Sequence, residues 1–370
     1  MYPCRLTNKA SAPIRNSGHG ASLQSSFQTW NSILPGTALG GFNDRVREEV
    51  SVTVVITGAT GMIGSHLYAC LAAMGRNPCV LSRVPASVRL PCAVRALPAP
   101  DATGVAFEAA LAGASHVVHC AALNSDRDGN GEDTFLQANA VLTAKLARAA
   151  ARTVPGRFVF LSSTRAMADA GETVRLTQDT PCRPTSPYGR SKLEAERLLR
   201  EAYDAVGRAD AVTLRLPPVY GEGMRGQLGA LLRLADTPLP LPMKAYGAPR
   251  TLASCRSVAE AIVLLLDHGG ALESTYLAGD RASVNAGDIL RAFRHGLGRP
   301  ERLFAAPDGL LWMAAAFARQ GKAARLLGAG QTLEPARLAA LGWTPEADTS
   351  AALAGLAARI SRSHAAARRS

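Results

Sequence analysis

Residues Val52–Leu67 read VTVVITGATGMIGSHL, and this stretch decides the fold. A β-branched apolar run stops at Gly58, two more glycines follow at intervals of three, and a helical apolar pattern then begins. The order predicts a strand, a tight turn and a helix. Gly58 permits the turn, Gly61 lets backbone approach a pyrophosphate, and Gly64 allows close helix–strand packing. Because the free N–H groups and the positive end of the helix dipole lie at this turn, we predict a dinucleotide site rather than a plain structural turn.

The length and apolar content bound the architecture. The chain has 370 residues, of which 47% are hydrophobic, enough for one large domain or two that share a site. No apolar run approaches the roughly 18 residues of a transmembrane helix, so we predict no stable membrane insertion. The run Leu310–Phe317 is too short to span a bilayer. We expect a buried amphipathic helix there, with contact to a membrane interface as the open alternative.

The formal net charge of +12 suggests nucleic acid as an alternative partner. The basic residues are mostly scattered arginines, and no basic stripe alternates with aromatic residues. We therefore predict no nucleic-acid partner. A cleft that binds phosphorylated ligands would account for part of the excess positive charge. The high Ala and Arg content is typical of a high-GC genome, which would account for the rest.

The cysteines indicate free thiols in a reducing cytoplasm. They are odd in number and form no C-x-x-C pair, so we predict neither disulfides nor a metal site. The seven are Cys4, Cys70, Cys79, Cys92, Cys120, Cys182 and Cys255.

The order of expected elements predicts an α/β fold with a Rossmann-like, doubly wound parallel sheet. The first strand and turn occupy about 51–64. Further strands are expected at Asn77–Arg83, Val94–Leu97, Ala114–Ala122 and Gly156–Thr164, and helices at Ala106–Ala112 and Phe135–Ala151. Ligands of such sheets bind beyond the carboxyl ends of the strands, where Gly58, Ser82, Ala121 and Ser163 are expected.

We predict four segments. Residues 1–49 are rich in Gly, Ser, Asn, Pro and Thr and read as a disordered leader or an over-long translation start. Residues 50–219 form the dinucleotide-binding domain, with a strand and a helix contributed by 250–280. A smaller C-terminal, mainly substrate-binding domain occupies 220–350. Residues 351–370 form a basic tail, plausible as a terminal helix with a frayed end.

The end of the second strand bears on the choice of cofactor. An acidic residue there would bind both ribose hydroxyls and favour NAD, but Ser82 and Arg83 stand there instead. A serine and an arginine can accept a 2′-phosphate. The site therefore takes NAD or NADP, with a slight preference for NADP, although arginine can also stack on adenine.

A second landmark is Thr185–Glu196, with the sequence TSPYGRSKLEAE. Tyr188 and Lys192 are four residues apart and share a helix face. An isolated tyrosine is a poor base at neutral pH, and a nearby ammonium would lower its pKa. Ser163 would hold the reacting oxygen while Tyr188 moves the proton. The alternative is an ordinary Tyr/Lys pair on a surface helix.

These motifs together resemble the extended short-chain dehydrogenase/reductases, of the NAD-dependent epimerase/dehydratase type. The resemblance covers about 51–348 and rests on TGATGMIG, HCAA, FLSS, PYGRSK, RLPPVYG and LGWTP. Within this family the chain is similar to bacterial nucleotide-sugar 4-epimerases and 4-keto-reductases of the UDP-N-acetylquinovosamine type. The resemblance implies a cytoplasmic homodimer acting on a UDP-linked sugar for surface-polysaccharide or lipopolysaccharide synthesis.

The resemblance also implies roles for individual residues. Ser163, Tyr188 and Lys192 would be catalytic. The cofactor would contact Gly58, Thr60, Gly61, Met62, Ile63, Gly64, Ser82, Arg83, Ala121, Ala122, Tyr188, Lys192 and Pro218. The substrate would contact Asn139, Thr164, Arg225 and Arg250.

The chain departs from the family pattern at two places. Gln227 and Leu228 stand where asparagine and an aromatic residue are usual, and Arg256 replaces an aspartate. The identity of the sugar, and the choice between epimerase and 4-keto-reductase, therefore stay open. The other functions that we consider are a reductase of a non-sugar substrate and a non-catalytic dinucleotide sensor.

Overall fold

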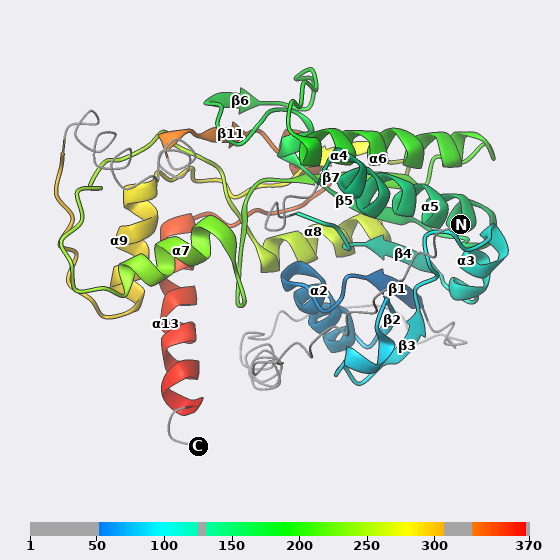
Figure 1. The fold of residues 1–370 in the computed structure, drawn as a ribbon, viewed down its shortest axis with the longest axis horizontal. Helices are drawn as coiled ribbons and strands as arrows, with labels where there is room; N and C mark the ends of the chain where they lie inside the picture. Colours follow the sequence, from blue (N-terminus) through cyan, green and yellow to red (C-terminus); the bar gives the residue numbers. More distant parts are fainter. Residues whose placement is uncertain (1–51, 125–130, 307–327, 368–370) are drawn as a thin grey trace, which may run out of the picture.

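A seven-stranded, wholly parallel sheet forms the centre of the molecule (Figure 1). The computed structural model describes residues 52–124, 131–306 and 328–367. The strand order is β10-β7-β5-β4-β1-β2-β3. The strands are β1 (Thr53–Thr57), β2 (Asn77–Ser82), β3 (Ala93–Ala96), β4 (His116–His119), β5 (Phe158–Ser163), β7 (Ala211–Leu216) and β10 (Thr275–Leu277). The order reverses between β1 and β4, which is where this architecture binds dinucleotides. The predicted fold class is confirmed.

Helices cover both faces of the sheet. Val54 and Ile56 of β1 pack towards one side with α2 and α8, and Val55 packs towards the other with α3, α5 and α6. This alternation follows from the two-residue period of a strand, and burial on both faces explains the continuous apolar runs. The helices are α2 (Met62–Ala73), α8 (Cys255–Asp267), α3 (Gly104–Ala110), α5 (Leu142–Thr153) and α6 (Pro187–Asp204).

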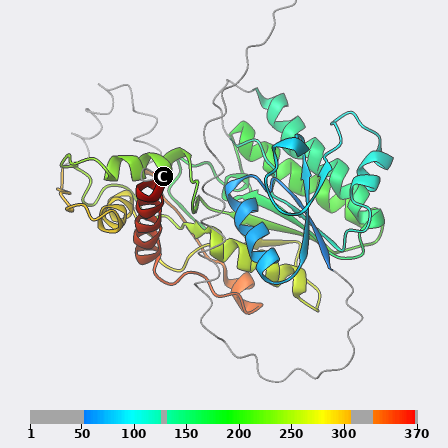
Figure 2. The same ribbon diagram turned by 90° about the horizontal axis from the view of Figure 1, so that it is seen from below.

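A smaller unit with its own apolar core lies to one side of the sheet (Figure 2). It is built around α7 (Gly226–Ala235), α9 (Ala286–Gly296) and α13 (Thr349–Ala367). Asn285 and Asp288 form a capping box at the start of α9. Because Leu353 and Leu356 of α13 are buried in this core, most of the stretch expected as a basic tail is an integral helix.

The remaining strands form two small parallel pairs outside the central sheet, β6–β11 and β8–β9. Each pair joins segments that are distant in the sequence. Their bounds are β6 (Val174–Leu176), β11 (Gln331–Leu333), β8 (Val219–Tyr220) and β9 (Ala253–Ser254), and the short helices are η1 (Pro85–Ser87), η3 (Thr164–Ala166) and α12 (Ala336–Ala340).

One predicted helix is interrupted. The stretch Phe135–Ala151 is split into α4 (Glu132–Phe135), a π-helical turn η2 (Leu136–Val141) and α5. A π-turn inserts extra backbone into a helix and is often found at functional sites.

The predicted leader 1–49 and the apolar run Leu310–Phe317 lie outside the described residues. None of the described helices is long and apolar enough to cross a membrane.

Candidate active site

The glycine turn after β1 has the geometry that a pyrophosphate requires. Gly58 has a φ of +72°, and a Cβ there would lie 2.7 Å from the backbone nitrogen of Ala121. A Cβ on Gly64 would lie 2.2 Å from the Gly58 carbonyl oxygen. Both positions therefore exclude any side chain, the first by backbone conformation and close approach, the second by contact between helix and turn.

The first turn of α2 is free to receive an anion. Gly61 is the N-cap residue, it is exposed, and α2 has no acidic residue in its first turn. Thr60 is exposed and Met62 and Ile63 are half-buried beside it. The N–H groups of this turn and the helix dipole are thus not neutralised by a side-chain carboxylate of α2 itself. The turn fits the phosphates of a dinucleotide.

The ends of β2 and β4 flank this turn. Arg83 is exposed, whereas the Ser82 hydroxyl accepts a hydrogen bond from the Val84 N–H (3.2 Å). Ala121 donates its N–H to the Thr57 hydroxyl (3.2 Å), and Ala122 is exposed. The structure therefore brings the glycine turn and the Ala121 backbone together, as the sequence suggested for two strands that end at the same edge.

His119 supports this edge from within. Its Nδ1 lies 2.6 Å from the Thr57 hydroxyl and its Nε2 lies 3.1 Å from the Thr143 hydroxyl. Burial, reinforced by the charge of Lys192, lowers the pKa of His119 to about 3, so the ring is neutral. It links β1 to α5 through two hydroxyl groups and has no charge to offer a reaction.

Tyr188 lies at the start of α6, beside the end of β5. Pro187 occupies the first helical position, and the Ser186 hydroxyl accepts a hydrogen bond from the Gly189 N–H (3.2 Å), which caps the helix. Burial raises the pKa of Tyr188, and this outweighs the lowering by a hydrogen bond with Ser163 and by the charge of Arg165. The structure thus brings Ser163 and Tyr188 together.

Lys192 is placed differently from our expectation. It is 2% exposed, its Nζ donates to the Leu161 carbonyl oxygen (2.7 Å), and Nζ lies 4.3 Å from the centroid of the Phe160 ring. Burial lowers the pKa of Lys192 to about 8, opposed by Glu196 and Cys120. The expectation of a lowered Tyr188 pKa is wrong here, because burial dominates and Lys192 points to the main chain of β5.

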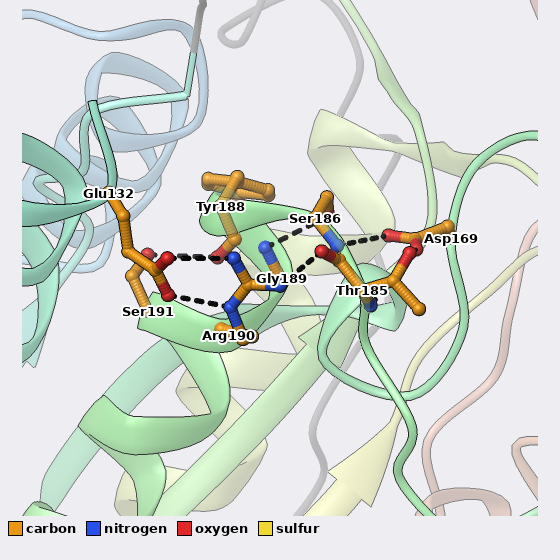
Figure 3. Close-up of polar contacts among 8 residues, drawn as sticks. All are labelled: Glu132, Asp169, Thr185, Ser186, Tyr188, Gly189, Arg190 and Ser191. Atoms are coloured by element: carbon orange, nitrogen blue, oxygen red, sulfur yellow. Dashed lines mark hydrogen bonds and ion pairs between the residues drawn. The ribbon is translucent and has the colours of Figure 1, made fainter. Parts of the chain in front are cut away.

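An outer polar network fixes the segment that enters α6 (Figure 3). Glu132 of α4 forms a double ion pair with Arg190, at 2.6 Å to Nε and 2.9 Å to Nη2. Asp169 accepts hydrogen bonds from the backbone N–H groups of Thr185 (3.0 Å) and Ser186 (3.2 Å), and from the Thr185 hydroxyl. These contacts fix the helix start that carries Tyr188.

An inner polar network lies two turns further along the same helix. Arg215 of β7 donates to Glu196 from Nη2 (2.6 Å) and from Nε (3.1 and 3.2 Å), and the Ser162 hydroxyl donates to the same carboxylate. The side chains of Glu196 and Arg215 are 2% and 8% exposed. Glu196 is also one helical turn from Lys192, whose pKa it raises.

The side-chain amide of Asn139 is hydrogen-bonded within the protein. It is buried in the π-helical turn η2, where its Nδ2 donates to Leu123 O (3.0 Å) and Ser191 Oγ (2.9 Å). Its Oδ1 accepts from the Leu123 N–H (2.8 Å). The amide therefore joins the chain after β4 to helix α6, and its proposed contact with substrate stays a prediction.

Two of the other residues predicted to contact ligands, Thr164 and Arg250, bind to the same short segment of the chain, 329–331. The buried Thr164 hydroxyl donates to Gln331 Oε1 (3.2 Å). Arg250 is buried and its Nη2 donates to Ala329 O (2.5 Å), whereas Arg225 is exposed at the N-cap of α7. Pro218 is exposed just after β7. The predicted roles of Thr164, Arg225, Arg250 and Pro218 in ligand binding stay predictions.

The sequence reasoning missed Arg165, Phe135, Glu196 and Arg215. Only Glu196 had a local signal, since it repeats the four-residue spacing from Tyr188 to Lys192 on one helix face.

The departure from the family pattern at Leu228 has a structural reason, because this side chain is buried in the core of the smaller unit. Arg256 pairs instead with Glu260 (2.8 Å). In the described part of the chain no cluster of three or more His, Cys, Asp or Glu could hold a metal ion.

The chain is similar to known proteins in sequence and in fold. Residues 54–279 match the NAD dependent epimerase/dehydratase family. The chain is 28% identical over 256 residues to a UDP-glucose 4-epimerase of Vibrio cholerae, covering 67% of this chain and 76% of that one. It is 30% identical over 272 residues to 2'-dehydrokanamycin reductase of Streptomyces kanamyceticus, covering 68% and 69%. The solved UDP-glucose 4-epimerase of Thermus thermophilus, in complex with NAD, has a TM-score of 0.65 and 25% identity and covers 84% of this chain and 99% of that one.

Proposed function

This chain belongs to the NAD dependent epimerase/dehydratase family, and from that premise we propose that it is a UDP-sugar 4-epimerase working with NAD. The observation that carries the proposal is the position of Tyr188, which meets Ser163 at the carboxyl edge of the sheet that also holds the glycine turn. The similarity to UDP-glucose 4-epimerases supports the choice of reaction.

The residues of the chain divide the work. The glycine turn and the start of α2 would hold the diphosphate of NAD, and the dinucleotide would supply reversible hydride transfer at carbon 4 of the sugar. Ser163 holds the 4-oxygen by a hydrogen bond. Tyr188 takes the proton of the 4-hydroxyl and gives it back when the opposite face is reduced. Lys192 donates to the Leu161 carbonyl oxygen and so holds the start of α6 against the end of β5.

The direct test is Tyr188→Phe assayed with UDP-glucose and UDP-N-acetylglucosamine. Loss of the proton-transfer group should reduce turnover by at least about 100-fold, while nucleotide binding stays intact. Tyr203→Phe is the matched control, because Tyr203 is buried on the same helix and its hydroxyl has no partner among the described residues. Undiminished turnover by the Tyr188→Phe variant would exclude the proposed mechanism.

A second candidate is a reductase that exchanges its cofactor. It is favoured by the end of β2, where Arg83 is exposed and no carboxylate follows the strand, and by the similarity to a reductase. Mass spectrometry of nucleotide that co-purifies with the protein separates the two. Retained NAD and no oxidation of added cofactor identify the epimerase, whereas an empty site and NADPH consumption with a UDP-4-keto-6-deoxy sugar identify the reductase.

Two further parts of the proposal rest on the sequence resemblance alone. One is a role in surface-polysaccharide synthesis, and the other is a homodimer. Light scattering of the purified protein measures the second directly, and loss of a surface glycan after disruption of the gene measures the first.

A further inference from the structure

Arg165 is fixed beside the proposed site by the turn that follows β5. It lies two residues after Ser163, in the short helix η3, and its backbone N–H donates to the Ser163 hydroxyl oxygen (3.2 Å). The position of this arginine is therefore tied to the same hydroxyl that meets Tyr188. Nothing in the motifs of the sequence assigned Arg165 a role.

The guanidinium of Arg165 lies against the ring of Tyr188. Its central carbon is 5.0 Å from the ring centroid, within the range of a cation–π contact. The ring of the buried Phe135 meets Tyr188 edge-on, with centroids 6.1 Å apart and an interplanar angle of 69°. The ring of Tyr188 thus contacts both a cation and an apolar ring.

The charge of Arg165 is not neutralised by an ion pair with a described residue. Its Nε is buried and has no hydrogen-bond partner in the described part of the chain. The other charged groups nearby bind other partners. Lys192 donates to a main-chain carbonyl oxygen, Arg190 forms an ion pair with Glu132, and Asp169 accepts hydrogen bonds from the segment before α6. A buried N–H without a partner costs free energy, so its retention calls for a reason.

We propose that Arg165 is a positioning residue for Tyr188. The guanidinium of Arg165 stabilises the phenolate form of Tyr188, which takes the proton of the substrate. The inference rests on the proposed function of Tyr188. It transfers to Arg165 much of the electrostatic role that the spacing of Tyr188 and Lys192 predicted for Lys192.

Two physical arguments support this transfer. A cation at the face of an aromatic ring is attracted more strongly once the ring carries a negative charge, and partial burial reduces screening by water. The charge of Arg165 lowers the pKa of Tyr188, against the larger effect of burial. Lys192 has no comparable effect on that group, because it is directed to the Leu161 carbonyl oxygen.

The first experiment measures the titration of Tyr188 without substrate. Protein labelled with ¹³C at the tyrosine hydroxyl-bearing carbon is titrated by NMR, and the Tyr188 resonance is identified by its loss in Tyr188→Phe. We expect Arg165→Met to move the Tyr188 titration to higher pH by about one pH unit or more. We expect Arg165→Lys to restore part of the shift.

The second experiment measures the pH profile of kcat/KM. Arg165→Met should lower activity about tenfold at neutral pH, with recovery as the pH rises. Arg200→Met is the matched control, because Arg200 is an exposed arginine of α6 about 18 Å along the helix from Tyr188. That control should leave both the titration and the profile unchanged.

Each outcome decides between alternatives. An unchanged Tyr188 titration in folded Arg165→Met overturns the inference. A rise in KM with kcat and the pH profile unchanged also overturns it, since Arg165 would then bind substrate only. Absence of any UDP-sugar turnover by the unmodified protein refutes the proposed function, but the NMR titration still tests the effect of Arg165 on Tyr188.

Discussion

Helix α6 carries two polar networks of similar chemistry that differ in burial. The outer network pairs Glu132 with Arg190, whose side chains are 46% and 40% exposed. The inner network pairs Glu196 with Arg215, at 2% and 8%. Both consist of one carboxylate held by one guanidinium, and both attach α6 to another element. Only the inner pair has been removed from water.

Burial changes what each pair is worth. In water-exposed pairs the attraction is screened and opposed by side-chain entropy. In the interior the attraction is strong, but each partner alone is a buried charge that the fold tolerates poorly. The outer network should therefore affect only the position of the segment that enters α6. In the inner network, each buried charge needs its partner for the fold to be stable.

The largest effect is expected at Arg215. Arg215→Met leaves the Glu196 carboxylate buried without its partner and should lower the free energy of unfolding by about 3–5 kcal/mol. Urea denaturation followed by circular dichroism measures this. The matched control is the double variant Glu196→Gln with Arg215→Met, which removes both charges and should recover most of the loss. Equal instability of the single and double variants would show that packing, not charge, is what Arg215 contributes.

A pH-dependent effect is expected at Lys192, beside the inner pair. Burial lowers its pKa from 10.5 to about 8, so the unfolded chain binds more protons between these values and stability rises with pH there. Lys192→Met removes this group. The unmodified protein should therefore gain about 3 kcal/mol relative to the variant between pH 8 and 10.5. Parallel denaturation series over this window provide the measurement, and a constant difference would contradict the assignment.

A smaller effect is expected at Asp169 in the outer network. Partial burial raises its pKa, but hydrogen bonds from Ser186 and Thr185 lower it more, so the net pKa lies below its usual value. Asp169→Asn should destabilise by about 1 kcal/mol at neutral pH. Because a depressed carboxyl pKa stabilises only while the group is ionised, the difference should vanish as the pH falls through the folded pKa. Thermal melts at several acidic pH values test this.

The smallest effect is expected at Glu132. Glu132→Gln removes an exposed ion pair and should leave stability within experimental error, because solvent screens the pair. Any effect should disappear in high salt. A loss as large as that of Arg215→Met would show that exposure does not separate the two networks. Turnover of this variant also reports whether the entrance to α6 is held by Glu132 or mainly by Asp169.

Local sequence patterns predicted the parts of the site that local geometry determines. The roles of Gly58 and Gly64 depend on neighbouring backbone and agree with the structure. The juxtaposition of Arg165 and Tyr188, and that of Glu196 and Arg215, depends on how helix α6 packs against η3 and β7. The raised pKa of Tyr188 was missed for a related reason: spacing on a helix says which face Lys192 shares, but not that its ammonium turns to Leu161.

The edge strand β10 has a consequence for synthesis on the ribosome. The nascent chain delivers β1 to β7 first, then residues 217–274, and only then β10, which pairs with β7. During that interval the edge of β7 presents unpaired N–H and C=O groups, a template for pairing with other chains. Translational pausing between 217 and 274 should therefore favour aggregation. The time taken to synthesise residues 217–274 thus sets how long the edge of β7 stays unpaired in the nascent chain.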